Sequence, residues 1–140
     1  MHESKSIEEI SLGEKVAYSK TFTEEDVIKF AEATGDFNPI HFDEEYAGQT
    51  IFGARIVHGS LTISLASAAL GMKLPGLGTI AYEIQCRFRQ AVYLGDTVTV
   101  MAEAIEKNEA RNLITFQCTW TNQTGIVVAT GRAMVMPPRK

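Results

Sequence analysis

The segment 60–70 carries no charged residue on any side of the helix that its composition favours. It consists of leucine, isoleucine, alanine, serine and threonine, and Gly71 follows it. A helix that is apolar or small all round is normally enclosed by protein, and its hydroxyl groups can bond back to its own carbonyls. The sequence therefore predicts a buried helix that ends at Gly71 and that other parts of the chain must cover.

Four stretches after this helix alternate between apolar and polar residues, as half-buried strands do. They are residues 79–89, 97–107, 113–121 and 126–136. In the first of them, every second side chain from Ile80 to Phe88 is apolar, which predicts one apolar face. The later strands are joined by connections too short for a parallel crossover, so the sheet is predicted to be mostly antiparallel.

The N-terminal part adds one strand and one helix. Residues 14–22 have the pattern of a strand, Thr23 stands where a helix cap is expected, and Gly35 stands where the helix ends. The 140 residues contain no repeat or linker, which predicts a single domain, residues 1–140. We therefore expect an α+β protein with a curled, mostly antiparallel sheet of about five strands wrapped around a long apolar helix. That arrangement is the hotdog fold.

Charge and cysteine usage argue against several classes of protein. Lys and Arg number 13 against 17 Asp and Glu, and no basic run occurs, so a nucleic-acid partner is not expected. The longest apolar stretch, residues 61–70, is too short to cross a bilayer, and the N-terminus has no signal-peptide pattern. Cys86 and Cys118 form no disulfide or zinc motif, and we expect reduced, buried thiols. The sequence predicts a cytoplasmic protein with no membrane contact, no metal and no nicotinamide or flavin cofactor.

The densest polar cluster spans residues 35–43 and includes Asp36, Asn38 and His41. Asp36 and His41 are five residues apart on a loop bent by Pro39, a spacing that lets both side chains converge. A carboxylate and an imidazole aimed at one water can activate it, because an imidazole titrates near neutral pH. The same residue types also form ordinary turns, in which Asp36 would only bond backbone amides. From the residues alone both roles remain open.

A second cluster, Ile56-Val57-His58-Gly59-Ser60, lies directly before the apolar helix. A glycine at a helix N-terminus leaves free N–H groups and lets a ligand approach the backbone closely. Such amides suit a carbonyl oxygen that becomes negative during a reaction. In the alternative interpretation Gly59 and Ser60 form an ordinary cap. For His58 we expect a structural role, as a packed histidine.

Together the two clusters resemble the hydratase-2 motif of MaoC-like (R)-specific enoyl-CoA hydratases. The matching string is Gly-Asp-x-Asn-Pro-x-His-x-Asp at residues 35–43, followed by Ile-Val-His-Gly at residues 56–59. The resemblance extends from about residue 12 to residue 136 and includes Leu-Gly-Asp at residues 94–96. Arg55 stands where relatives often have proline, and Ser60 where they often have methionine. These departures affect the rim of the pocket and leave the catalytic groups in place.

The resemblance implies reversible hydration of a trans-2-enoyl-CoA to the (R)-3-hydroxyacyl-CoA, which is a hydro-lyase reaction of fatty acid metabolism. In the family, the residues that match Asp36 and His41 hold the catalytic water. The amide that matches Gly59 donates to the thioester carbonyl. Which of Asp36 and His41 moves which proton stays open at this point. Coenzyme A enters as part of the substrate, and no separate cofactor is implied.

The resemblance also suggests residues around the substrate. Ser67, Leu70 and Met134 match positions that line the acyl pocket, although each is equally an ordinary core residue. Asn38 is expected to fix the loop or the catalytic pair beside the substrate. Three cations are weaker candidates for contacts to the phosphates of coenzyme A: Lys73, Arg87 and Arg89.

Three other functions compete with this one. A 3-hydroxyacyl-[acyl-carrier-protein] dehydratase would share the site and differ in what its surface binds. A hotdog thioesterase usually has a carboxylate on the central helix, and residues 60–70 contain none. A non-catalytic acyl-thioester-binding module would not need both Asp36 and His41. Because a chain of 140 residues has little room for a private acyl cavity, we expect at least a homodimer with two sites at its interface, as in the family.

Overall fold

The computed structural model describes residues 3–140. Helices and strands occur in the predicted order, with two short 3-10 turns in addition. In chain order the elements are η1 (Ile7–Glu9), β1 (Lys15–Thr21), α1 (Glu24–Thr34), η2 (Pro39–His41), α2 (Glu44–Gly48), α3 (Gly59–Ile63), α4 (Leu65–Met72), β2 (Ile80–Phe88), β3 (Thr97–Asn108), β4 (Leu113–Thr121) and β5 (Val127–Met136).

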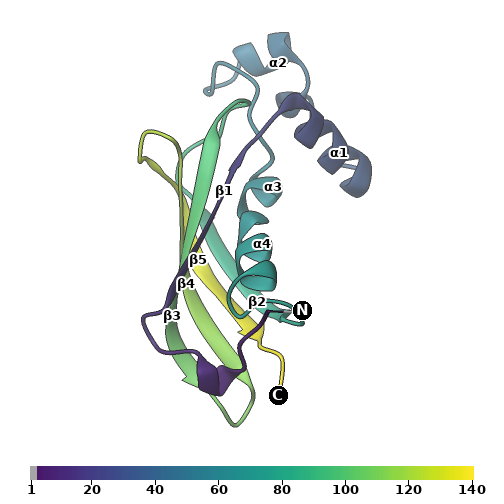
Figure 1. The fold of residues 1–140 in the computed structure, drawn as a ribbon. Helices are drawn as coiled ribbons and strands as arrows, with labels where there is room; N and C mark the ends of the chain where they lie inside the picture. The colour runs from purple at the N-terminus through teal and green to yellow at the C-terminus, as the bar shows by residue number, and fades with distance from the viewer. Residues whose placement is uncertain (1–2) are drawn as a thin grey trace.

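The five strands form one sheet in the order β1-β3-β4-β5-β2, and every neighbouring pair is antiparallel. Figure 1 shows the sheet curving along one side of α3 and α4, while α1 and α2 lie beyond one end of it. The helix α4 packs against β1 and β3. The hotdog arrangement and the antiparallel sheet are therefore confirmed, although the sheet stays open and does not close around the helix.

The helix α1 begins and ends where the sequence predicts. Thr23 Oγ1 accepts a hydrogen bond from the backbone N–H of Asp26 at 3.2 Å, and the Asp26 carboxylate accepts one from the N–H of Thr23 at 2.9 Å. Gly35 ends the helix in the left-handed region, with a φ of 85°, which glycine adopts without strain. The loop that carries Asp36 therefore leaves α1 at a well-defined point.

The predicted apolar helix is divided in two. It begins at Gly59 and continues past Gly71 to Met72, with a break at Ser64 between α3 and α4. Ser64 Oγ donates to the carbonyl of Leu61 at 2.5 Å, and the N–H of Ser67 donates to Ser64, which tightens the turn at this point. The expected helix over residues 60–70 is corrected accordingly. Ser64 and Ser67 are exposed, so the helix is covered on one side only in the single chain.

The hydrophobic core lies between α4 and the hollow face of the sheet. Phe22, Phe116 and Trp120 are completely buried in it. Complete burial of a side chain of this size contributes about 1.5–3 kcal/mol relative to exposure. The strands also contribute Val98, Val100, Ile114, Ala129 and Val135, and α4 contributes Leu65, Ala66, Ala69 and Leu70.

The strand β2 differs from its prediction, because its apolar side chains are exposed. The exposed fractions are 62% for Ile80, 50% for Ile84 and 56% for Phe88. A bulge at Tyr82 shifts the register, so that Ile80 lies opposite Met136 while Ile84 lies opposite the buried Ala133. The alternating residues therefore do not share one face, and β2 is an uncovered edge of the sheet.

Both cysteines are free, and Cys118 is buried as predicted, while Cys86 is only half-buried. Within residues 3–140, no helix is long and apolar enough to span a membrane.

Candidate active site

The loop after α1 is shaped by its own side chains. The Asn38 side chain accepts a hydrogen bond from the N–H of Ile40 at 3.2 Å and caps the turn η2. The Asp43 carboxylate accepts one from the N–H of Tyr46 at 3.0 Å and caps α2. Asn38 therefore holds the loop in shape, which is one of the two roles expected for it, and Asp43 has a structural role.

His41 is held by η2 in a largely buried position, with 7% of its surface exposed. Its Nδ1 donates to the carbonyl oxygen of Ile56 at 2.7 Å. Because a carbonyl can only accept, Nδ1 carries the hydrogen, and Nε2 of the neutral ring is left as a proton acceptor. Burial lowers the pKa of His41 below its ordinary value, and the neighbouring His58 and Arg55 act in the same direction. The hydrogen bond to Ile56 and the charge of Asp36 partly oppose this shift of the pKa.

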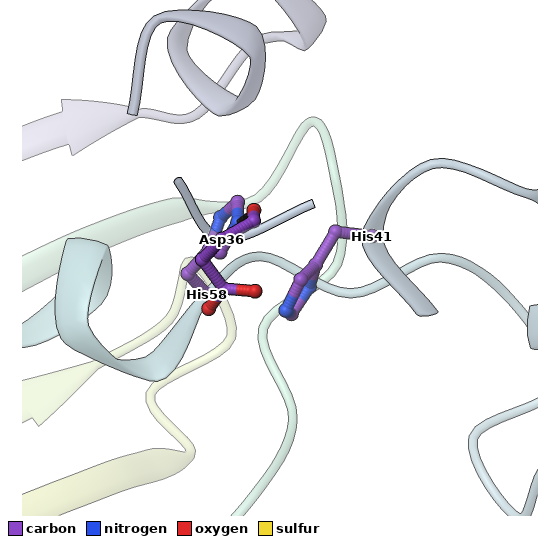
Figure 2. Close-up of side chains that lie close together, drawn as sticks. All are labelled: Asp36, His41 and His58. Atoms are coloured by element: carbon purple, nitrogen blue, oxygen red, sulfur yellow. Dashed lines mark hydrogen bonds between the residues drawn. The ribbon is translucent and has the colours of Figure 1, made fainter. Parts of the chain in front are cut away.

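Asp36 directly follows Gly35 at the start of the loop and is exposed. One of its carboxylate oxygens accepts a hydrogen bond from the N–H of Asn38 at 3.2 Å. Figure 2 shows the carboxylate beside the rings of His41 and His58, and one polar atom from each of the three residues lies within 4.8 Å of the others. No direct hydrogen bond joins the Asp36 side chain to His41 in the described part of the chain. A single water fits between groups at this separation.

His58 belongs to the same cluster and is 2% exposed. Its Nε2 donates to the backbone carbonyl of Asp36 at 3.0 Å, and its ring stacks on His41 with centroids 3.8 Å apart. Phe30 of α1 covers it at 4.7 Å between centroids. His58 therefore packs as a structural histidine, but its contacts to both Asp36 and His41 were not predicted. Nothing in the sequence spacing relates residue 58 to the loop.

The three residues Asp36, His41 and His58 are close enough to share a metal ion, but the rings are poorly arranged for one. The two imidazoles stack with 30° between their planes, so their in-plane lone pairs lie side by side and do not converge. His41 Nδ1 and His58 Nε2 are also used in hydrogen bonds to carbonyls. The cluster fits a polar water better than a cation.

Arg55 joins the His41 turn to the start of α1. Its Nε donates to the backbone carbonyl of His41 at 2.7 Å, and its other two nitrogens each lie 2.9 Å from a carboxylate oxygen of Glu24. Only 13% of the Arg55 side chain is exposed. The departure from the family's usual proline therefore affects the support of His41, where the sequence suggested only the pocket rim.

Gly59 is the first residue of α3, and no side chain caps this helix end. No acceptor for its N–H occurs within residues 3–140, so the group is free for a ligand. A Cβ at this position would lie 2.8 Å from the ring of Phe88, so only glycine fits here without displacing that ring. Gly59, Phe88 and Ile56 line a cleft of about 720 Å³. Ile56 connects this cleft to His41, because its carbonyl holds the imidazole.

A second hollow, of about 270 Å³, lies between α4 and the strands β2 and β5. Ser67 and Leu70, two of the residues expected beside an acyl chain, line it. Met134 does not, and its neighbours Ala133 and Val135 take that place. Successive side chains of a strand point to opposite faces, so Met134 points away from the hollow. The structure therefore separates Met134 from Ser67 and Leu70, with which the sequence grouped it.

The three side chains expected to contact the phosphates of coenzyme A do not lie together in the structure. Lys73 Nζ donates to the carbonyl of Ala17 at 2.9 Å and lies over the Tyr18 ring, beside β1. Arg87 and Arg89 lie instead on β2 and directly after it, at the other edge of the sheet. Lys73 therefore does not join the two arginines.

The family described as "MaoC like domain" matches residues 9–125. The chain belongs to this family. Among curated proteins, the MaoC-like chain is 38% identical over 133 residues to an (R)-specific enoyl-CoA hydratase of Rhodospirillum rubrum, covering 95% of this chain and 92% of the relative. It is 31% identical over 133 residues to a mitochondrial 3-hydroxyacyl-[acyl-carrier-protein] dehydratase of Arabidopsis thaliana, covering 92% of this chain and 78% of that protein.

Solved structures agree with this placement. The MaoC-like chain superposes on the R-hydratase PhaJ1 from Pseudomonas aeruginosa with a TM-score of 0.89 and 38% identity. The match covers 96% of this chain and 86% of that one. The family and fold inferred from residues 35–43 and 56–59 are confirmed.

Proposed function

We propose that this protein is an (R)-specific enoyl-CoA hydratase, a hydro-lyase that adds water reversibly to trans-2-enoyl-CoA. The observation that carries the proposal is His41, whose Nδ1 is occupied by Ile56, so that Nε2 is left to accept a proton in a residue that lies beside the Asp36 carboxylate. A base, an acceptor for a water and the free N–H of Gly59 are the groups that hydration of an unsaturated thioester requires.

In the proposed reaction, the water lies between Asp36 and His41. His41 Nε2 accepts one of its protons while the water oxygen bonds to C3, and Asp36 accepts a hydrogen bond from the other hydrogen. The electron pair of the double bond moves to the thioester oxygen, where the N–H of Gly59 stabilises the negative charge. The imidazolium then gives a proton to C2, so that one complete water has been added and His41 is neutral again. The acyl chain extends along Ser67 and Leu70.

The proposed scheme uses no metal ion and no cofactor, and coenzyme A takes part only as a portion of the substrate. The stacked rings of His41 and His58 support a scheme without a metal ion. Coenzyme A is preferred over a carrier protein because three relatives that match 95% of this chain, at 37–39% identity, are named for coenzyme A thioesters or as enoyl-CoA hydratases. The carrier-protein dehydratase of Arabidopsis thaliana is 31% identical. A non-catalytic binding module would not need a histidine whose Nε2 is left to accept a proton.

The first prediction is that the wild-type protein hydrates crotonyl-CoA and that variants of Asp36 and His41 lose turnover while keeping their fold. We expect purified protein to remove the conjugated absorbance of crotonyl-CoA near neutral pH and to form the (R)-3-hydroxyacyl product. Asp36→Asn and His41→Gln should each lower kcat by about 10²–10⁴-fold, the range typical of a general acid–base group. Circular dichroism should show unchanged folds.

Asp43→Asn is the matched control for these variants. It removes a carboxylate from the same loop, but asparagine caps a helix as well as aspartate does, so turnover should be retained. If wild-type protein at high concentration hydrates no short or medium enoyl-CoA, the proposed activity is wrong. If either Asp36→Asn or His41→Gln keeps full turnover, the assignment of that residue is wrong.

We also propose that the working enzyme is a homodimer in the cytoplasm, with a role in fatty acid metabolism. Support for the dimer comes from β2, an edge strand whose apolar side chains Ile80, Ile84 and Phe88 are uncovered. Pairing of two β2 strands would cover these side chains and satisfy the free backbone groups of the edge. Free thiols at Cys86 and Cys118 agree with a reducing compartment.

A further inference from the structure

Three arginines line one shallow hollow at the edge of the sheet formed by β2 and β5. They are Arg87, Arg89 and Arg132, and all three are exposed. The hollow has a volume of about 300 Å³, and its other polar side chains are the neutral Gln85, Gln117 and Thr130. We refer to it below as the arginine hollow.

The strand register places the arginine hollow on the outer face of the sheet, away from the core. Arg132 lies opposite Gln85, and Arg87 lies opposite Thr130. Their strand neighbours Ala129 and Ala133 are buried, so alternation directs Arg132 and Thr130 outward. Arg89 comes directly after β2, and its Nε donates to Thr130 Oγ1 at 3.3 Å, which directs its side chain to the same face.

The positive charge of the arginine hollow is not neutralised locally. No carboxylate lines it, and none of its three arginines forms an ion pair within residues 3–140. The nearby Glu83 carboxylate instead accepts a hydrogen bond from Gln85 at 3.0 Å. In a chain of net charge −4, three such guanidinium groups create a local field that attracts an anion. Guanidinium groups bind phosphate oxygens in pairs of parallel hydrogen bonds.

The arginine hollow adjoins the cleft that contains Gly59. Arg89 lines both, and the preceding residue, Phe88, touches Gly59. The two hollows therefore lie on either side of the point where β2 ends. The pantetheine arm of coenzyme A is about as long as four extended residues, roughly 14 Å. A thioester bound at Gly59 can therefore extend around the end of β2 to Arg89.

We infer that the arginine hollow binds the diphosphate and 3′-phosphate groups of coenzyme A when the thioester lies at Gly59. The inference rests on the proposed function for the position of the thioester. Arg89 is placed to meet the diphosphate, and Arg87 and Arg132 lie further out on the same face. Pairing of two β2 strands through their backbones would leave these outward side chains in solvent.

The test separates the phosphates from the thioester. Arg87→Gln, Arg89→Gln and Arg132→Gln are compared with Arg139→Gln, which removes one exposed charge outside the arginine hollow. kcat/KM is measured for crotonyl-CoA and for crotonyl-pantetheine, which has the same thioester but no phosphate. We expect the ratio of the two values to fall about tenfold in each variant of the arginine hollow and to stay unchanged in Arg139→Gln.

Calorimetry with free coenzyme A provides a readout that needs no turnover. The Kd should rise about tenfold in the three variants, and the change should be smaller when 3′-dephospho-coenzyme A is the probe. Equal ratios and equal Kd values in all variants would overturn the inference while leaving the hydratase proposal intact. A loss seen only with a crotonyl carrier-protein substrate would overturn it in favour of a protein partner.

The hydratase proposal can also fail separately. If neither thioester is hydrated, the hydratase proposal is wrong. The calorimetric comparison still shows whether the arginine hollow binds the phosphates of coenzyme A. Weaker coenzyme A binding in the three variants would then support the phosphate site, and unchanged binding would refute it.

Discussion

The main-chain carbonyl of Ile56 determines which nitrogen of His41 can act as a base. It accepts the Nδ1 hydrogen at 2.7 Å, and Nε2 is therefore the nitrogen left to accept a proton. His58 and Arg55 support this arrangement from two sides, through the stacked ring and through the His41 carbonyl. At the scale of single residues, the proposed chemistry depends on neighbours that have no reactive role themselves.

The pH dependence of hydration should reflect the burial of His41. Burial lowers the pKa of His41 below the ordinary 6.5, so Nε2 stays unprotonated to a lower pH than in a free histidine. We expect the acid limb of the kcat/KM profile below pH 6.5. The unfolded chain binds this proton more readily than the folded one. The contribution of His41 to stability is therefore complete above the ordinary pKa and is lost as the pH falls through the folded pKa.

Variants of Arg55 provide the control for this profile. Arg55→Gln removes a positive charge that lowers the pKa of His41, so the acid limb should move to higher pH. Arg55→Lys keeps the charge and should leave the limb in place. A limb above pH 6.5 in the wild-type enzyme, or no difference between the two variants, would contradict this account.

His58→Phe tests the supporting ring directly. Phenylalanine can preserve the packing against His41 and Phe30, but it cannot donate to the Asp36 carbonyl. Loss of one such hydrogen bond costs about 1 kcal/mol, so we expect kcat for crotonyl-CoA to fall roughly five- to tenfold with KM little changed. An unchanged kcat would show that the bond does not position the Asp36 loop.

At the scale of elements, the contact between β5 and β2 depends on a glycine. A Cβ on Gly131 would overlap the main-chain oxygen of Gln85 and lie 2.8 Å from Cys86 Cα. Main-chain atoms cannot rotate aside as a side chain can, so β2 would have to move off the sheet. The position of β2, with Phe88 against Gly59 and the arginine hollow at its end, therefore depends on this close approach.

Gly131→Ala should accordingly destabilise the protein by about 1–3 kcal/mol, the range for overpacking. The midpoint of urea unfolding measures the effect. Gly48→Ala is the matched control, because a Cβ there meets nothing within 4 Å. Equal midpoints for Gly131→Ala and wild type would contradict the close approach of β2.

At the scale of the whole molecule, the single chain leaves one long element uncovered. The strand β2 is an edge strand with Tyr82 and Ile84 about half exposed, at 51% and 50%, and the hollow lined by Ser67 and Leu70 opens beside it. Edge strands of this kind are usually covered, charged or paired. In the proposed dimer, a second copy of the chain covers β2.

Sedimentation should therefore show a dimer, and Ile84→Glu should shift it to monomer with reduced turnover. The introduced charge would be buried without a partner in a paired β2, which costs several kcal/mol. Met101→Glu is the control, because it places the same charge on another exposed apolar residue, in β3. A fully active monomer at assay concentration would contradict the proposed dimer.

The order of the predicted elements, the two ends of α1 and the antiparallel sheet followed from the sequence because each depends on neighbouring residues. Thr23 and Gly35 act within a few residues of their own positions. The residues 35–43 were likewise recognisable as one cluster from their spacing alone. The prediction failed for β2, which had to be placed against distant elements. It also failed at Ser64, whose hydroxyl bonds back to the carbonyl of Leu61 and tightens the turn that divides the helix.

By itself, the sequence determined the fold class and the family, and it predicted that Asp36 and His41 lie close together. These features depend on local patterns and on one contiguous motif. Only the tertiary structure decided that His58 and Arg55 support His41, that Met134 points away from the hollow lined by Ser67 and Leu70, and that Arg132 joins Arg87 and Arg89. The physical reason is that these contacts depend on strand register, a bulge at Tyr82 and loop closure. They join residues that lie 14 to more than 40 positions apart, and no local pattern records them.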